Sequence, residues 1–297
     1  MLFTPLRYPG GKSKLYDLFS LLVDSNFKTK PSYAEPYAGG AGLALALLLT
    51  DKVKNVYIND YDRSIYAFWY TLLNSTDRLI DRIEGVEVTV QEWERQHLIQ
   101  KDKEYADLFE LGFSTFFLNR TNRSGIIKGG MIGGKRQESK WKLDARFNKA
   151  DLICRIKRIA ERKNDIHVSN LDAMNFLDKM RAEKLRNVFY YLDPPYIKKA
   201  QGLYAHFYNE NDHRNIASAI RSFKSKWVVS YDSEDFVKEL YDGYLQMTYD
   251  LRYSAQTKRC GREFMAFSHT INLPTELQQM INVSKIRNIS NVNFKVA

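Results

Sequence analysis

Residues 32–49, Ser-Tyr-Ala-Glu-Pro-Tyr-Ala-Gly-Gly-Ala-Gly-Leu-Ala-Leu-Ala-Leu-Leu-Leu, decide the fold of this chain. Ser32 to Glu35 has the pattern of a strand end, and Gly42 to Leu49 has the pattern of a helix. The glycines between them let backbone N–H groups approach a ligand and leave the N-terminus of the helix open. Asn55 to Asn59 and Arg63 to Leu73 repeat the strand and helix pattern. This succession predicts βαβ units and therefore an α/β fold.

The alternation of strands and helices is interrupted once and then resumes. Residues 89–163 look mostly helical, with Glu104 to Leu118 as the clearest case, and enclose a polar, glycine-rich stretch from Thr121 to Lys142. Further strand candidates follow at residues 166–168, 188–192, 227–231 and 263–268, with helical segments at 211–223 and 234–240.

These patterns predict a doubly wound, mostly parallel α/β sheet with a mainly helical inserted domain. We assign residues 1–75 and 164–275 to the domain that carries the sheet, and residues 76–163 to the insert. Residues 276–297 are expected to form a peripheral tail. In such sheets ligands bind at the carboxyl ends of the strands, so the residues after each strand are the candidates for chemistry.

The composition is that of a globular protein with a basic surface. The chain has 297 residues, of which 44% are apolar and 27% are charged, so disorder and coiled coil are excluded. The formal charge of +10 indicates either a polyanionic partner or simply a basic protein. The longest apolar run, residues 42–49, is far shorter than the roughly 18 residues of a membrane span. We therefore expect no membrane segment and a cytoplasmic location.

Neither cysteine nor histidine indicates a metal site. Cys154 and Cys260 are the two cysteines, and they form neither a Cys-x-x-Cys pair nor a disulfide framework. The five histidines show no metal-ligand spacing and no pairing with a nucleophile. We expect no metal in the mechanism.

The N-terminal segment Arg7-Tyr8-Pro9-Gly10-Gly11-Lys12-Ser13 imitates a phosphate loop at its Gly-Lys-Ser end. A Walker A motif needs a further glycine at the position of Leu6, and no strand precedes the segment. Two interpretations remain open: a glycine turn that starts a helix, or a ligand contact.

The turn after the first strand predicts a cofactor site together with Asp60. The turn is not a complete dinucleotide fingerprint, because Leu45 stands where the third glycine would be. Asp60 ends the next strand, twenty residues after Gly40, where an acid can accept hydrogen bonds from ribose hydroxyls. The alternative is that Asp60 caps a helix, although Asp62 suits the cap better. The combination predicts an adenosine-containing cofactor.

The most specific motif is Asp193-Pro194-Pro195-Tyr196, at the end of an apolar strand. The two prolines hold the backbone extended, so the Asp193 carboxylate and the Pro194 carbonyl can both act as acceptors. Tyr196 adds a flat ring beside them. This set suits an aromatic amine, because two acceptors can direct its N–H bonds and its lone pair toward an incoming methyl group. The alternative is a Pro-Pro stop after a strand with a capping aspartate.

The chain resembles the Dam-type adenine-N6 DNA methyltransferases from Leu6 to about Ser268. The resemblance rests on Tyr8 to Lys12, Pro36 to Gly39, Asp60, Asp172 and Asp193 to Tyr196, which occur in the order of that family's motifs. It implies a Rossmann-like class I methyltransferase fold that binds S-adenosylmethionine and carries an inserted target-recognition domain.

The resemblance also implies the roles of individual residues. Tyr8, Lys12, Asp60 and Asp193 are expected to contact the cofactor, with Asp172 at its adenine, and Glu35 and Gly39 belong to the same set. The turn has the sequence Gly39-Gly40-Ala41-Gly42 where the family has Gly-x-Gly. The sequence therefore does not determine which backbone amides face the methionine end of the cofactor.

Residues 119–142 are the predicted DNA-binding stretch. They contain seven basic residues and one acid, a net charge of +6, and five of the chain's 15 glycines. A basic, glycine-hinged loop can follow a phosphate backbone, although a solvated loop is the alternative. The residues that we expect to contact DNA are Asn119, Arg120, Arg123, Lys135 and Arg136. The basic run from Arg155 to Lys163 is expected to be a solvated helix face, and Lys198 to Tyr208 to be either a lid or an ordinary loop.

The sequence thus predicts a site-specific DNA methyltransferase that acts on the adenine exocyclic amine of a flipped base. Ser124-Gly125 replaces the Asn-Gly of many relatives, so a GATC target cannot be carried over. The same chemistry on cytosine N4, RNA adenine or a protein glutamine is an alternative. Another alternative is a nucleic-acid-binding protein without catalytic activity, but the presence of both Asp60 and Asp193 argues against it. We expect double-stranded DNA as the partner, and a cognate restriction endonuclease of the same system is a further candidate partner. We expect the protein to be a monomer.

Overall fold

The computed structural model describes residues 3–8, 12–196, 208–252, 260–274 and 289–295. Most of the segment predicted as a lid, residues 198–207, lies outside them. Within the described residues, eight strands form one sheet in the order β3-β2-β1-β4-β5-β7-β6-β8. The strands are β1 (Ser32–Glu35), β2 (Val56–Asn59), β3 (Ile166–Ser169), β4 (Val188–Leu192), β5 (Lys226–Asp232), β6 (Leu245–Arg252), β7 (Cys260–Phe267) and β8 (Ile289–Lys295).

The first five strands are parallel to one another, and β7, β6 and β8 continue the sheet in antiparallel pairings. The predicted doubly wound, mostly parallel sheet is confirmed. β6 was missed, although its sequence Leu-Gln-Met-Thr-Tyr-Asp-Leu-Arg alternates apolar and polar residues. Residues 289–295, which we placed in a peripheral tail, form the edge strand β8.

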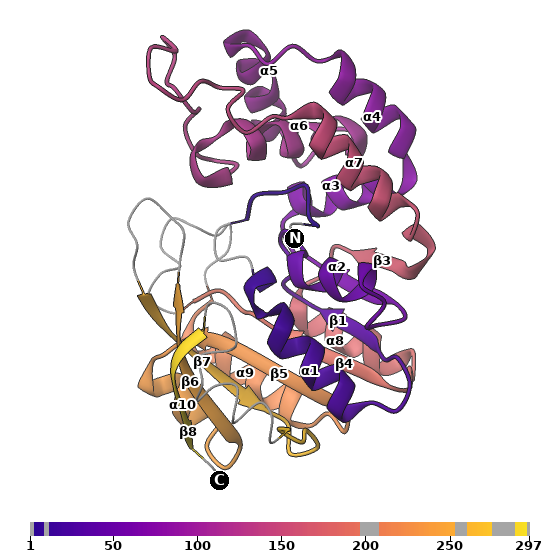
Figure 1. Cartoon of the computed structure of the whole chain (residues 1–297), viewed down its shortest axis with the longest axis vertical. Helices are drawn as coiled ribbons and strands as arrows, with labels where there is room; N and C mark the ends of the chain where they lie inside the picture. The colour runs from indigo at the N-terminus through magenta and orange to yellow at the C-terminus, as the bar shows by residue number, and fades with distance from the viewer. Residues whose placement is uncertain (1–2, 9–11, 197–207, 253–259, 275–288, 296–297) are drawn as a thin grey trace.

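Helices cover both faces of the sheet (Figure 1). β4 shows this directly, because all five of its residues are buried. Phe189 and Tyr191 pack in one core with α1 (Tyr16–Asn26) and α2 (Gly42–Leu49), while Tyr190 packs in another with α8 (Ala173–Ala182) and α9 (Glu210–Arg221). The remaining helices around the sheet are η1 (Lys12–Leu15), α3 (Arg63–Asn74), η3 (Lys163–Asp165) and α10 (Asp235–Leu240).

One buried side chain fixes the carboxyl ends of three neighbouring strands. Asn59, at the end of β2, is 1% exposed. Its Nδ2 donates to the carbonyls of Pro36 and Leu171, at 3.0 and 2.9 Å, and its Oδ1 accepts from the Leu171 N–H at 2.9 Å. Because Pro36 follows β1 and Leu171 follows β3, the amide holds together the edge at which ligands bind.

The insert is a group of helices between α3 and β3: α4 (Thr76–Gly85), α5 (Val90–Lys101), α6 (Leu108–Thr121), η2 (Arg123–Gly125) and α7 (Lys149–Ala160). α6 is buried along most of its length and packs against α3. The two helices approach closely at Gly112, where an added Cβ would lie 2.3 Å from Thr71 Oγ1. The predicted start of α6 at Glu104 was wrong by four residues, because the Asp107 side chain caps the N–H groups of Phe109 and Glu110.

Candidate active site

Asp193 lies at the carboxyl end of β4, where one of its oxygens is held by two neighbours. Ser230 of β5 donates from Oγ to Asp193 Oδ1 at 2.7 Å, and Lys12 Nζ of η1 lies 3.1 Å from the same oxygen. Among the described residues no donor contacts Oδ2. Burial raises the pKa of Asp193 above its ordinary value, although Lys12 and Ser230 oppose that rise. The carboxylate is thus fixed on one side and open on the other.

Tyr196 is buried beside Asp193 and is held through its hydroxyl. Lys12 Nζ donates to Tyr196 Oη at 2.5 Å, and Tyr196 Oη donates to Glu263 Oε2 at 2.7 Å. Glu263 lies on β7 and is fully buried. Sequence reasoning assigned Tyr196 only a stacking role and missed both Ser230 and Glu263. The signal for Glu263 was an acid at the start of an apolar strand, Glu-Phe-Met-Ala-Phe.

The two prolines between Asp193 and Tyr196 come directly after the strand and have trans peptide bonds. Pro194 is buried and Pro195 is half-buried. That the Pro194 carbonyl acts as an acceptor stays a prediction.

The glycine turn after β1 is built around Asp60 and Tyr8. The Gly39 N–H donates to Asp60 Oδ2 at 2.8 Å, and the Asp62 N–H donates to Oδ1 at 2.9 Å. Gly39 has a φ of +47°, and a Cβ there would lie 2.6 Å from the Tyr8 ring. Only glycine allows both the backbone conformation and this close contact. Asp62, not Asp60, caps α3 through the Ser64 N–H, as we expected.

Burial raises the pKa of Asp60 to about 7. The N–H groups of Asp62 and Gly39 and the ammonium of Lys103 act in the opposite direction, and the carboxylate of Asp62 adds to the rise. Each carboxylate oxygen can accept a further hydrogen bond, so Asp60 retains the capacity to bind hydroxyl groups.

Glu35 and Asp172 are the other predicted cofactor residues, and their surroundings differ. Glu35 is 4% exposed, and its Oε2 has no hydrogen-bond partner among the described residues. Burial raises the pKa of Glu35 well above its ordinary value, and the nearby Asp193 adds to this. Asp172 caps α8, because its Oδ1 accepts from the Met174 N–H at 2.8 Å. Whether Asp172 also contacts a cofactor stays a prediction.

These residues fit an adenosine-containing cofactor with a cationic amino acid end. A buried carboxylate oxygen without a donor, at Glu35, suits an ammonium or hydroxyl group of a ligand. Asp60 places a second carboxylate at the end of the neighbouring strand. S-adenosylmethionine, the cofactor expected from the sequence resemblance, has both of these parts.

Two of the predicted DNA contacts are engaged inside the protein instead. Asn119 is 1% exposed and binds the backbone of Arg7 and Gly125. Arg120 is 8% exposed, and its Nε donates to the Arg146 carbonyl at 2.8 Å. Burial, together with the neighbouring Arg7 and Arg155, lowers the pKa of Arg120 to about 10. Both side chains therefore hold the insert together, and neither is exposed as a base-reading residue must be.

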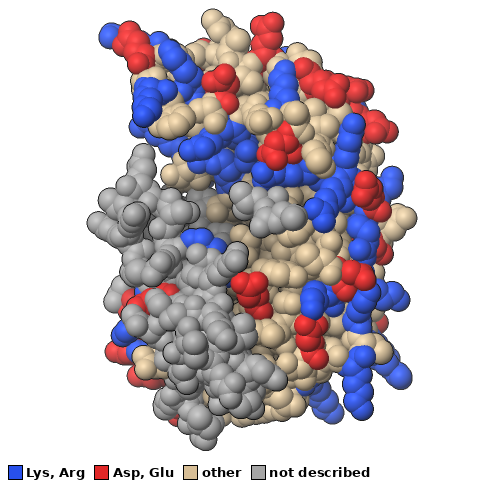
Figure 2. All heavy atoms as spheres, in the orientation of Figure 1, with Lys and Arg blue, Asp and Glu red and all other residues tan. Residues whose placement is uncertain are grey.

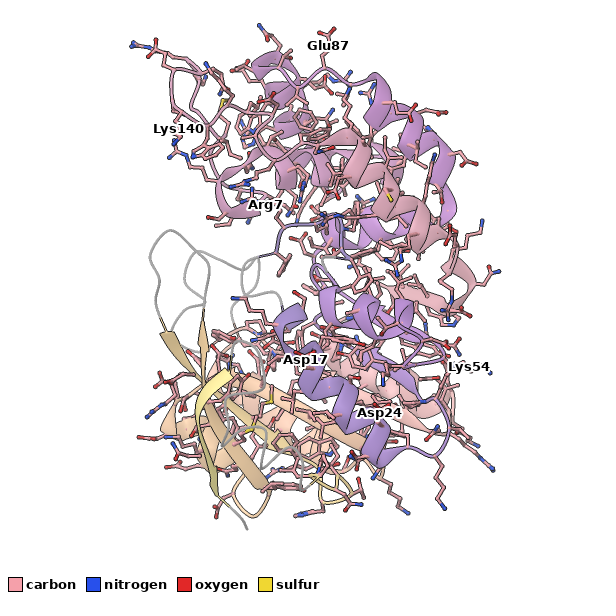
Figure 3. The ribbon with its side chains drawn as sticks, in the orientation of Figure 1. Arg7, Asp17, Asp24, Lys54, Glu87 and Lys140 are labelled. Carbon is pink, nitrogen blue, oxygen red and sulfur yellow. The ribbon has the colours of Figure 1, made fainter. Side chains whose placement is uncertain are left out.

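The other three predicted DNA contacts are exposed. Arg123, Lys135 and Arg136 lie on η2 and on the irregular segment that follows it. Lys135 pairs with Glu94 of α5 at 3.3 Å, an exposed ion pair that DNA phosphate could replace. Figure 2 shows Lys and Arg side chains gathered along the lower edge of the insert, where the surface is hollowed between the insert and the rest of the molecule. In Figure 3, Arg7 lies at this edge and Lys140 lies on the outlying segment of the insert.

Neither a membrane-spanning helix nor a metal-binding group is present among the described residues. No helix there is long and apolar enough to cross a bilayer. No group of three or more histidine, cysteine, aspartate or glutamate side chains in that part of the chain is arranged to hold a metal ion.

Several known proteins are similar to this chain in sequence or in structure. The type II methyltransferase M.CviBI of Paramecium bursaria Chlorella virus NC1A is 21% identical over 254 residues, which cover 84% of this chain and 90% of the relative. A solved SAM-dependent methyltransferase from Agrobacterium tumefaciens has a TM-score of 0.42 and 8% identity, over 86% of this chain and 62% of that structure, which is less than two thirds. The rRNA methyltransferase aviRa from Streptomyces viridochromogenes has a TM-score of 0.38 and 11% identity, over 89% of this chain and 86% of that one.

The family of this chain is decided by its amino-acid sequence. The D12 class of N6 adenine-specific DNA methyltransferases matches residues 8–255, which include the N-terminal motif, the glycine turn, the insert and the Asp-Pro-Pro-Tyr motif. The chain belongs to the family of D12 class N6 adenine-specific DNA methyltransferases.

Proposed function

We propose that Asp193, Pro194, Pro195 and Tyr196 hold the target adenine while its N6 amine accepts the methyl group of S-adenosylmethionine. The observation that carries this proposal is that the two oxygens of the Asp193 carboxylate differ in their hydrogen bonds. Its Oδ1 is fixed by Ser230 and Lys12, whereas Oδ2 receives no donor from the described residues. An open, oriented acceptor at the carboxyl end of a central strand is what an amine substrate requires.

The adenine amine has two N–H donors and a lone pair that is delocalised into the ring. Asp193 Oδ2 would take one N–H and the Pro194 carbonyl the other, so that the nitrogen becomes more tetrahedral and its lone pair points at the methyl group. The cofactor supplies an electrophilic methyl group. As the nitrogen forms the new C–N bond, the bond between the methyl carbon and the sulfonium sulfur would break with its electron pair left on sulfur, and the nitrogen would lose one proton to water. The protein contributes through position and electrostatics.

For the cofactor we propose the set Tyr8, Lys12, Glu35, Gly39, Asp60, Asp172 and Asp193. The buried Glu35 Oε2 without a partner supports contact with the ammonium group of the methionine end. Asp60 would accept the ribose hydroxyls at the end of β2. The ring of Tyr8 packs on the Gly39 turn and so shapes the wall of the site.

For DNA we propose that the exposed Arg123, Lys135 and Arg136 contact phosphate along the basic edge of the insert. Phosphate contacts give affinity and register, while sequence must be read by base-edge contacts in a groove. The target would be a specific site in double-stranded DNA, with the adenine flipped toward Asp193.

Because its relative is named a type II methyltransferase, we also propose that this chain is partnered with a restriction endonuclease. We propose that it acts as a monomer in the cytoplasm. Light scattering with and without a DNA duplex would measure the oligomeric state.

The experiment that tests the proposed function is sequencing of DNA from cells that express the chain, by a method that detects modified bases. We expect N6-methyladenine at one recurring short sequence, and none in cells that express Asp193→Ala. Methylation of cytosine, or of adenine without any sequence preference, would contradict the proposal.

A further inference from the structure

Glu263 is a fully buried carboxylate on β7, outside the motifs from which the active site was predicted. A carboxylate without exposure is costly unless its oxygens are paired and hydrogen-bonded. β7 pairs with β5 in antiparallel fashion, with Glu263 opposite Asp232. This register places Glu263 at the carboxyl end of β5, the edge of the sheet at which Asp193 also lies.

Two residues of the active site are among the partners of Glu263. Its Oε2 accepts from Tyr196 Oη at 2.7 Å and lies 3.5 Å from Lys12 Nζ. Lys12 Nζ in turn donates to Tyr196 Oη and lies 3.1 Å from Asp193 Oδ1. Lys12 is therefore shared between two carboxylates and a phenol.

The charge of Lys12 depends on both carboxylates. Burial alone would lower the pKa of Lys12, but Asp193 and Glu263 raise it above its ordinary value. The ammonium thus stays charged in a buried place and is attracted from two sides. With one side removed, it would move toward the other.

We propose that Glu263 is a positioning residue of methyl transfer, which fixes the Tyr196 ring and holds Lys12 back from the open oxygen of Asp193. The proposal rests on the proposed roles of Asp193 and Tyr196. With Glu263 present, Lys12 Nζ lies 3.1 Å from Oδ1, and no hydrogen bond from the described residues reaches Oδ2, which is left for the amine. Without it, the Tyr196 hydroxyl loses a buried carboxylate acceptor, and the ammonium competes with the adenine amine for Asp193.

The test compares Glu263→Gln, Tyr196→Phe and the double variant with the wild type in single-turnover methyl transfer. The matched control is Ser268→Ala, just past the other end of β7, which also removes a buried polar group. Urea unfolding checks that each variant is folded, and calorimetry measures S-adenosylmethionine binding.

We expect Glu263→Gln and Tyr196→Phe each to slow the methyl-transfer step about 10- to 100-fold, while DNA affinity changes less than about threefold. The double variant should lose less than the product of the two single losses, because both changes weaken the hydrogen bond between Tyr196 and the charged Glu263 carboxylate. Ser268→Ala should keep the wild-type rate within about twofold. In each single variant, the affinity for S-adenosylmethionine should fall by less than about threefold.

A Glu263→Gln enzyme with the wild-type rate, or a double variant whose loss is the product of the two single losses, would overturn the proposal. If Glu263→Gln does not fold, Tyr196→Phe decides, because it leaves the Lys12 and Glu263 charges in place. A full rate for Tyr196→Phe would then overturn it. Loss of activity in Asp193→Ala is measured in parallel, so that failure of the proposed function is distinguished from failure of this inference.

Discussion

The side-chain amide of Asn119 holds the backbone of Arg7 from both sides. Its Oδ1 accepts from the Arg7 N–H at 2.7 Å, and its Nδ2 donates to the Arg7 carbonyl at 2.8 Å and to the Gly125 carbonyl at 2.8 Å. One residue at the end of α6 therefore ties the insert to the N-terminal segment that leads to Lys12. Direct hydrogen bonds thus join the insert to the segment that precedes Lys12 in the sequence.

Replacement of Asn119 by alanine should destabilise the protein, because it leaves three backbone groups without their partner. We expect a loss of about 1–3 kcal/mol in the free energy of unfolding, measured in urea. The salt dependence of DNA binding should stay unchanged, since the amide contacts no phosphate. For stability the control is Arg123→Ala, because Arg123 is exposed and near the same turn, so its loss should leave the free energy of unfolding nearly unchanged. A stable Asn119→Ala with altered DNA binding would restore the DNA contact that we first predicted for Asn119.

Neutralisation of Lys135 and Arg136 together should weaken DNA binding in a way that depends on salt. Each phosphate contact contributes a slope of about −0.9 in the plot of log affinity against log salt concentration. The double variant Lys135→Gln and Arg136→Gln should therefore flatten that slope by up to about two units. Cofactor affinity should not change. The matched control is Lys54→Gln, which lies far from the insert (Figure 3). An unchanged slope would show that these side chains are only solvated.

Cofactor binding should depend on pH through Asp60. Ribose hydroxyls bind the ionised carboxylate better than the protonated form, and the pKa of Asp60 is raised to about 7. Affinity for S-adenosylmethionine should then rise by up to about 10-fold between pH 6 and pH 8, as calorimetry would measure. Asp60→Asn should bind about 1–3 kcal/mol more weakly, without this pH dependence.

The same pKa shift fixes the sign of the stability effect of Asp60. The folded protein binds this proton more tightly than the unfolded chain, whose ordinary value is 3.8. The contribution of Asp60 to the free energy of unfolding is therefore largest below about pH 4, falls as the pH rises to about 7, and is constant above that. Asp60→Asn should remove this slope, and a wild-type protein without it would contradict the shifted pKa.

The sequence predicted those parts of the fold and the site that depend on local pattern. The strand ends, the glycine turn, Asp60, Asp62 and the Asp-Pro-Pro-Tyr motif are visible because each is a short run with its own chemistry. Glu263 and Ser230 were missed, since their roles depend on strand pairings between β4, β5 and β7 that no local pattern contains. We interpreted residues 119–142 as a loop whose polar and basic side chains are all exposed. The structure instead buries Asn119 and Arg120, because α6 continues to Thr121 and packs on all sides.

The central claim is that this chain methylates the N6 amine of adenine in DNA with Asp193 as the open acceptor. The most direct test incubates purified protein with duplex DNA and S-adenosylmethionine, and then measures the methylated nucleosides by mass spectrometry after digestion. We predict N6-methyl-2′-deoxyadenosine with the wild type and none above background with Asp193→Ala, although Asp193→Ala still folds and binds DNA. N4-methyl-2′-deoxycytidine as the product, or full activity of Asp193→Ala, would contradict the account.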